Sequence, residues 1–171
     1  MKYSRNDLIF SDASANQMRN SIYHLERFMA QNGYEVLEIK ERLRRMGRNI
    51  AKTFFNYWRP INIVTLRNVK DVISTIYQKI VNSSVTIDID VSQNLIKIKD
   101  SKCALCKYHY DDISVAGCEI LLGLISELIF LIGKDSKDIS SIYLEPYEVE
   151  ESRALGNDSC LHVFKFKIEG G

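Results

Sequence analysis

The chain is poor in proline and glycine, which number two and eight among its 171 residues. So low a content excludes collagen-like repeats and proline-rich architectures, whose backbones depend on those residues. Basic and acidic residues nearly cancel, 23 against 22, so the positive excess typical of dedicated nucleic-acid-binding proteins is missing. A net charge near zero also removes the repulsion that keeps identical chains apart, and self-association is therefore expected.

Cysteine is absent before position 103, and the chain has four in total. Small secreted scaffolds need cysteines along the whole chain, because disulfides there compensate for a small core. The segment Met1 to Phe10 contains no apolar run of signal-peptide length. The most apolar run, Ile120 to Ile132, is too short to span a bilayer. We therefore expect a cytoplasmic protein with reduced thiols, which meets a membrane only peripherally.

Motifs for catalysis and phosphate binding are also missing. Gly133-Lys134 is followed by Asp135, without an upstream glycine at the spacing of a phosphate-binding loop. The three histidines are scattered at positions 24, 109 and 162, so there is no helical pair of the kind that binds zinc in proteases. The sequence thus predicts a protein that is not an enzyme.

Helical periodicity dominates the first half of the chain. Apolar residues recur at helical spacing over 14–32, over 35–58 and over 68–81, and each segment is predicted to be a helix. The first helix carries an apolar stripe that a compact domain does not need for its core, and we interpret it as the interface of a homodimer. The residues of this predicted interface are Met18, Ile22, Leu25 and Met29.

The apolar period changes from helical to two after residue 84. Residues 85–91 and 95–99 alternate around a short polar break, which is typical of a hairpin. Residues 114–132 are apolar nearly all round and predict a buried central helix. Strands are predicted over 139–148 and 160–168, with an acidic loop between them.

Runs of helices together with runs of antiparallel strands indicate an α+β fold, with the helices packed on one face of the sheet. The length of the chain suits a single domain, 1–171. Within it, residues 14–82 form the predicted helical part, and residues 84–171 the sheet with the central helix.

The cysteines allow two interpretations. Cys103 and Cys106 form a CxxC pair, which is half of a typical zinc site, while Cys118 and Cys160 are single residues on the central helix and the last strand. Free cysteines are also common as small apolar residues of a core. The cofactor prediction is therefore none, with zinc as the alternative.

Two further features bear on ligands. Residues 40–59 carry seven lysines and arginines, a face that suits anionic lipid or an acidic partner, or is simply solvated. Apolar residues of the second and central helices could line a lipid-sized slot, although a filled core is the commoner outcome. The predicted slot residues are Phe54, Phe55, Leu121, Leu124, Ile125 and Leu128.

Three stretches, taken in order, resemble one family. The segment 43–51 with its Gly47 resembles the LxxMGxxIG helix of the Bet- and Trs-type subunits of the TRAPP vesicle-tethering complex. The CxxC at 103–106, followed by the helix of 118–128 with Gly123, is similar to that family's short strand and glycine-bearing central helix. Residues 155–158 and the closing strand of 161–168 resemble its GD turn and terminal strand.

This resemblance implies a non-enzymatic scaffold or tethering subunit acting in membrane trafficking. The two N-terminal helices would form the homodimer interface, and the partners would be other TRAPP-like subunits or a small GTPase, with no nucleic acid. The family's second glycine is Ala51 here, and residues 59–68 lack the cysteine that is acylated in the best-known subunit. Covalent acylation in that loop is thus excluded, while noncovalent lipid binding stays open.

The chain also resembles the vinyl-4-reductase-like domains of archaea and bacteria, which share this fold. Their pattern implies a zinc site at Cys118, Glu145 and Cys160, but Ser152 stands about where another cysteine would fall. An acidic residue at 148, 150 or 151 could replace that cysteine. The alternative function is therefore a sensor that binds a small apolar ligand or hydrocarbon, with or without zinc.

Overall fold

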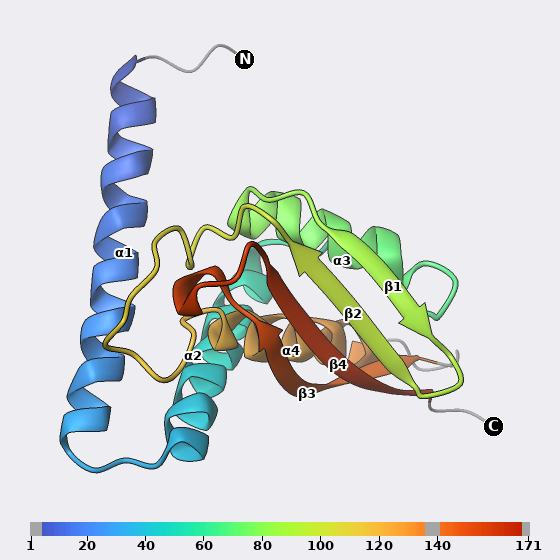
Figure 1. Ribbon diagram of the computed structural model, residues 1–171. Coiled ribbons are helices and arrows are strands. Elements are labelled where there is room, and N and C mark those ends of the chain that lie inside the picture. The colour runs from blue at the N-terminus through green and yellow to red at the C-terminus, as the bar shows by residue number, and fades with distance from the viewer. Residues whose placement is uncertain (1–4, 136–140, 169–171) are drawn as a thin grey trace.

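The computed structural model describes residues 5–135 and 141–168, and it shows helices packed on an antiparallel sheet. The elements in chain order are α1 (Arg5–Gln31), α2 (Val36–Tyr57), α3 (Val69–Ile76), the π-helical turn η1 (Tyr77–Val81), β1 (Thr86–Asp90), β2 (Leu95–Asp100), α4 (Glu119–Asp135), β3 (Ile142–Glu151), the 3-10 turn η2 (Arg153–Leu155) and β4 (Cys160–Ile168). Helices α2, α3 and α4 lie on one face of the sheet (Figure 1). The predicted α+β class is confirmed.

The sheet has the strand order β1-β2-β4-β3, and every neighbouring pair is antiparallel. Period-two alternation directs successive side chains of a strand to opposite faces of the sheet. On the helix side, Ile98 of β2 pairs with His162 of β4, and both are fully buried. On the other side, Lys97 forms an ion pair with Glu150 at 2.8 Å. The solvated face is thus covered by charged pairs, and the core lies between the sheet and the helices.

Helix α4 is the centre of that core. Ile125, Leu128 and Ile129 are fully buried, as expected for a helix that is apolar nearly all round. Helix α2 crosses α4 at very short distance because each contributes a glycine. A Cβ added to Gly47 would lie 1.9 Å from the carbonyl oxygen of Ile120, and one added to Gly123 would lie 1.9 Å from that of Arg44. The glycines therefore allow the two backbones to touch.

Several predicted boundaries were wrong. The central helix begins at Glu119 instead of residue 114, and the backbone N–H groups of Ser114 and Val115, which precede it, donate to a carboxyl oxygen of Glu26 at 2.9 and 3.2 Å. Strand β3 continues to Glu151, so most of the acidic residues assigned to a loop belong to a strand. The predicted start of that strand, residues 139 and 140, lies outside the described residues.

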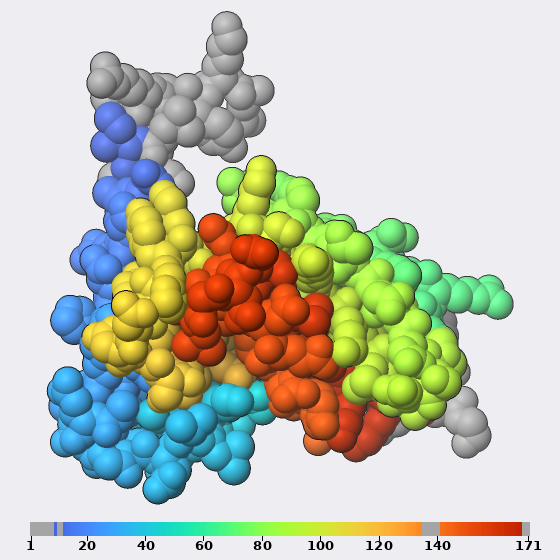
Figure 2. Space-filling model, viewed as in Figure 1, coloured from blue at the N-terminus to red at the C-terminus, as the bar shows by residue number. Residues whose placement is uncertain are grey.

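Helix α1 begins at Arg5, well before the predicted residue 14. Its N-terminal end extends past the body of the molecule, and its C-terminal half packs against the segment between β2 and α4, residues 101–118, hereafter the 101–118 loop (Figure 1). In the space-filling view this loop lies between α1 and the η2 turn (Figure 2). Polar side chains of α1 take part in this contact and hydrogen-bond to the loop.

Candidate functional site: an apolar cavity beneath α1

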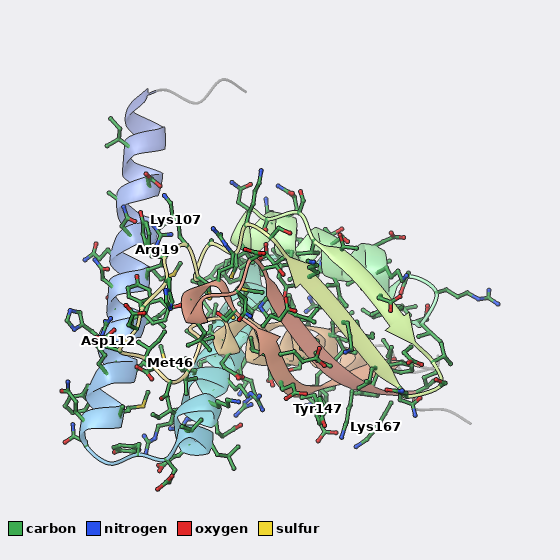
Figure 3. The ribbon with its side chains drawn as sticks, in the orientation of Figure 1. Arg19, Met46, Lys107, Asp112, Tyr147 and Lys167 are labelled. Atoms are coloured by element: carbon green, nitrogen blue, oxygen red, sulfur yellow. The ribbon has the colours of Figure 1, made fainter. Side chains whose placement is uncertain are left out.

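A cavity of about 490 Å³ lies between α1, α2 and α4. Its lining comes from α1, α2, η1, α4 and the 101–118 loop, and consists of Met18, Ser21, Ile22, Leu25, Met46, Ile50, Phe54, Ile80, Val81, Leu105, Ile120, Leu121 and Leu124. The volume falls in the range of small-molecule binding sites, roughly 300–1,000 Å³. Figure 3 shows Met46 in the space between α1 and α2.

The cavity exists because α1 is held above the α2–α4 pair by hydrogen bonds to the 101–118 loop. Arg19 donates to the carbonyl oxygen of Ala104 at 2.8 Å, and the Tyr23 hydroxyl donates to that of Leu105 at 3.0 Å. Glu26 accepts three hydrogen bonds from the loop, from the backbone N–H and hydroxyl of Ser114 and from the N–H of Val115. These three α1 residues, at helical spacing, are buried.

A second layer of contacts joins α1 to the outside of the loop. Arg27 forms a two-pronged ion pair with Asp112, at 2.6 and 2.8 Å, and this guanidinium holds the pKa of the Asp112 carboxyl below its usual value. Figure 3 shows Asp112 beside the C-terminal half of α1, and Arg19 with Lys107 nearer its middle. The loop and α1 therefore form one clamped unit along one side of the cavity.

The cavity offers no group for acid–base chemistry. Among the described residues that line it, Ser21 is the only polar one, and its hydroxyl donates to the Gln17 carbonyl of its own helix at 3.0 Å. Active-site pockets usually add several convergent polar or titratable groups to an apolar lining. The arrangement can bind an apolar chain by burying its surface, but it cannot activate one.

The structure brings some of the predicted slot residues to this cavity. Phe54, Leu121 and Leu124 line it. Ile125 and Leu128 are instead fully buried in the core, and Phe55 lies under the guanidinium of Arg59, with 4.0 Å between that group and the ring centre. Half of the predicted slot residues therefore lie outside the cavity lining.

The α1 stripe predicted as a dimer interface is largely directed into its own chain. Ile22 and Met29 are only 5% and 4% exposed, and Leu25 is half-buried. Met18 is the exposed member, at 49%. Three of the four, all but Met29, line the cavity. The dimer interface itself stays a prediction, with Met18 as its accessible residue.

The basic face of α2 is largely neutralised within the chain. Arg44 and Lys40 both pair with the buried Glu119, at 2.7 and 3.8 Å, and Lys52 lies 3.7 Å from Glu127. Arg42 and Arg48 also pair with acidic residues of α2. Such pairing weakens the case for this face as a membrane-binding surface. Across residues 5–135 and 141–168, we find no helix that is both long and apolar enough to cross a bilayer.

A second cluster of interest lies apart from the cavity lining. Cys103, Cys118, Cys160 and His162 bring their sulfur and ring-nitrogen atoms within 4.8 Å of one another, and all four residues are buried. Two of the three residues predicted to bind zinc, Cys118 and Cys160, thus come together. Glu145 does not join them, because it lies on the solvated face of the sheet, 3.2 Å from Lys167.

Hydrogen bonds from the neighbouring thiols of Cys103, Cys106 and Cys118 hold the pKa of Cys160 far below its usual value. The hydrogen bond from Cys118 to Cys103 raises the pKa of the Cys118 thiol, and burial adds to it. His162 was missed from the sequence, although it stands two residues after Cys160 on one strand, the spacing that places both on the same face.

Comparison with known proteins supports the fold. The structure is similar to the crystal structure of a trafficking protein particle complex subunit 3 from Naegleria fowleri, covalently bound to palmitic acid. The TM-score is 0.69 at 12% identity, over 91% of this chain and 96% of the other. No family model matches the sequence, and no curated protein matches it. The resemblance to TRAPP subunits is thereby confirmed at the level of the fold.

Proposed function

We propose that this protein is a non-enzymatic, TRAPP-like scaffold subunit of a trafficking-type complex, and that it holds a long apolar chain noncovalently beneath α1. The observation that carries the proposal is the cavity of about 490 Å³ with its almost wholly apolar lining. The similarity in fold to a subunit whose structure contains palmitic acid supports an acyl chain as the occupant.

The binding would differ from covalent acylation. Among the described lining residues there is no cysteine, and residues 59–68 contain none either, so no thiol is positioned there to form a thioester. Affinity would come from burying methylene groups, each of which contributes about 0.8 kcal/mol. An acyl chain would contact α1, α2 and α4 together and would therefore stabilise α1 in its docked position.

Fatty-acid binding tests the proposal directly. Delipidated protein is titrated with a fluorescent long-chain fatty acid, and palmitate is then added as a competitor. We expect saturable binding of about one probe per chain, displaced by palmitate. Leu124→Trp, which fills the cavity, should weaken binding at least about tenfold, because the probe and the indole compete for the same volume.

The matched control is Phe130→Trp, which places the same ring on an exposed position of the same helix. It should leave probe binding unchanged. Absence of saturable binding by the unmodified protein, or equal binding by Leu124→Trp, would refute the acyl-chain role.

The scaffold role requires a partner, and we propose a second copy of the chain, meeting along α1, with other subunits of the same fold completing the complex. The exposed Met18 is the residue that tests the homodimer.

Met18→Asp should shift sedimentation from dimer to monomer, because an unpaired charge would enter an apolar interface. Asn20→Asp is the control, since Asn20 is exposed on the same helix. A monomer before mutation, or an unchanged dimer after it, would exclude this interface.

A small-molecule sensor is the alternative function. The observation in its favour is that Leu105, whose carbonyl anchors α1 through Tyr23, also lines the cavity. Occupancy could therefore be transmitted to the position of α1. Amide hydrogen exchange of α1 that changes more than tenfold with ligand, without any change in oligomeric state, would favour the sensor over the scaffold.

A further inference from the structure

Four buried metal-ligating groups meet where the 101–118 loop, the start of α4 and β4 converge. The three sulfur atoms and the imidazole nitrogen lie within 4.8 Å of one another, and the exposed fractions of Cys103, Cys118, Cys160 and His162 are 1% or less. A tetrahedral zinc ion, with bonds of about 2.3 Å to sulfur and 2.0 Å to nitrogen, separates its ligands by roughly 3.5–3.8 Å. Only a small contraction of the cluster would complete that geometry.

The backbone explains why these residues converge. In the pairing of β2 with β4, Asp100 lies opposite Cys160 and Ile98 opposite His162. Cys160 and His162 are two residues apart and face the same side of the sheet. Asp100 then accepts a hydrogen bond from the backbone N–H of Lys102 at 3.0 Å, in the turn that leads directly to the buried Cys103.

The imidazole of His162 has one nitrogen engaged and one without a partner. Its Nδ1 lies 2.7 Å from the hydroxyl oxygen of Tyr77, while Nε2 is buried and makes no hydrogen bond within the described part of the chain. If Nδ1–H donates to Tyr77, the lone pair of Nε2 is free. An outer hydrogen bond that fixes the tautomer and ring orientation is typical of histidines that bind metals.

The sulfur of Cys160 is also placed in a polar setting. The backbone N–H of Arg153 donates to it at 3.5 Å, and the Cys160 thiol itself donates to the hydroxyl oxygen of Ser152 at 3.9 Å. A backbone N–H donor stabilises a thiolate, which is the form that binds zinc. A cluster of core thiols without a metal would need neither the N–H donor nor a histidine with a buried free nitrogen.

We propose that Cys103, Cys118, Cys160 and His162 bind one zinc ion in a closed, structural site. Four protein ligands leave no open coordination position, so the ion would serve stability and not catalysis. This ligand set has Cys103 and His162 in place of Glu145, the ligand that the resemblance to vinyl-4-reductase-like domains implies. The inference is independent of the acyl-chain proposal, because no residue of the cluster lines the cavity.

The consequence for the molecule is mechanical. Zinc would tie both ends of the 101–118 loop, at Cys103 and at Cys118 directly before α4, to β4. The residues directly after Cys103 carry the carbonyl groups that accept hydrogen bonds from α1, those of Ala104 and Leu105. The ion would thus fix the position of the loop on which α1 packs.

The test begins with metal analysis of tag-free protein, purified under reducing conditions without chelator. We expect about one zinc per chain, and X-ray absorption at the zinc edge with three sulfur neighbours and one nitrogen neighbour. Chelation should increase amide exchange in residues 103–118 at least tenfold, and added zinc should reverse the increase. Less than about a tenth of a metal per chain, with no zinc taken up by the reduced apoprotein, would overturn the site.

Matched variants test the ligand set. Cys118→Ser and His162→Gln should lose zinc. Cys106→Ser should retain it, since Cys106 lies in the same loop but is not one of the four residues whose ligand atoms lie within 4.8 Å of one another, and its sulfur is 3.4 Å from the Tyr23 hydroxyl. If the ligand variants fail to fold, the unmodified apoprotein is titrated with cobalt. The intensity of the thiolate-to-cobalt charge-transfer bands then reports how many thiolates bind the metal. An X-ray absorption spectrum that shows four sulfur neighbours would overturn the assignment. So would loss of zinc by Cys106→Ser together with its retention by His162→Gln. A disulfide bond within the cluster would overturn it as well.

Discussion

Helices α2 and α4 approach until their backbones touch, whereas α1 is held apart from both by polar side chains that reach a loop. In the first contact, Gly47 and Gly123 leave no room even for a methyl group. In the second, Arg19, Tyr23 and Glu26 bond to the 101–118 loop, and a cavity of about 490 Å³ remains. Small residues therefore close the α2–α4 interface, whereas long polar residues connect α1 to the loop and leave a cavity between α1 and the other two helices.

The α2–α4 contact should be the most sensitive point of the molecule. Gly47→Ala and Gly123→Ala each place a Cβ 1.9 Å from a carbonyl oxygen of the other helix. We expect each to lower the free energy of unfolding by about 3 kcal/mol, near the upper end of the usual cost of overpacking. The better helix propensity of alanine, about 1 kcal/mol, offsets only part of the clash. Urea denaturation measures the loss.

The control for this pair is Gly133→Ala on α4, where the nearest atom to an added Cβ is the Ser141 Cβ at 3.3 Å. Its cost should stay below about 1 kcal/mol. If Gly47→Ala proves equally mild, the two helices do not touch as described.

The polar contact of α1 should depend most on Glu26. Glu26→Ala leaves three donors of Ser114 and Val115 without their acceptor, and we expect a loss of about 2 kcal/mol. Glu26→Gln keeps a side-chain oxygen acceptor and should lose less than half as much. Limited proteolysis should cut the 101–118 loop faster in the alanine variant alone. Equal stability of both variants would show that α1 does not depend on this carboxyl group.

The cavity predicts that a leucine-to-tryptophan substitution changes the free energy of unfolding by different amounts at two positions of α4. Leu124 lines the cavity, whereas Leu122 is fully buried elsewhere in the core. Leu124→Trp should cost less than about 1 kcal/mol, while Leu122→Trp should cost about 3 kcal/mol, because only the first has volume to fill. Thermal melts of the two variants compare them. Similar losses would mean that the space beneath α1 closes in solution.

The smallest effect on stability is expected at the exposed ion pair between α1 and the 101–118 loop. The hydrogen-bonded guanidinium of Arg27 lowers the pKa of the exposed Asp112 carboxyl below its usual value. A depressed carboxyl pKa stabilises the fold above the unfolded-state value, and this contribution disappears as the pH falls through the folded-state value. Asp112→Asn should therefore melt slightly below the unmodified protein at pH 7, and the difference should disappear as the pH falls through the lowered pKa of Asp112.

Neighbouring Asp111, whose side chain is 95% exposed, provides the control, and Asp111→Asn should leave the melting temperature nearly unchanged at pH 7. Added salt should reduce the Asp112 effect, since exposed ion pairs are screened. A difference that grows as the pH falls would contradict the assigned ion pair.

The sequence alone determined the types of element and the class of fold. Residues 35–58 and 160–168 were placed almost to the residue, because helical and strand periods are properties of neighbouring positions. Gly47 and Gly123 belong to the motifs that carry the family resemblance. The need for glycine at these positions is explained only by the crossing of α2 and α4 in the structure. The start of the central helix was misplaced by five residues, and the residues before it hydrogen-bond to Glu26 of a distant helix, a contact that no local pattern specifies.

Only the tertiary structure decided which residues share a site. The cavity is bounded by α1 because three of its polar residues bind a loop far along the chain, and polar residues on a helix otherwise predict a solvated face. Cys103 joins Cys160 and His162 through the register of β2 on β4, and Cys118 through the start of α4. Register depends on hydrogen bonds between separate segments, so a pattern of single residues cannot specify it, whereas the periods that form each segment can be seen in the sequence.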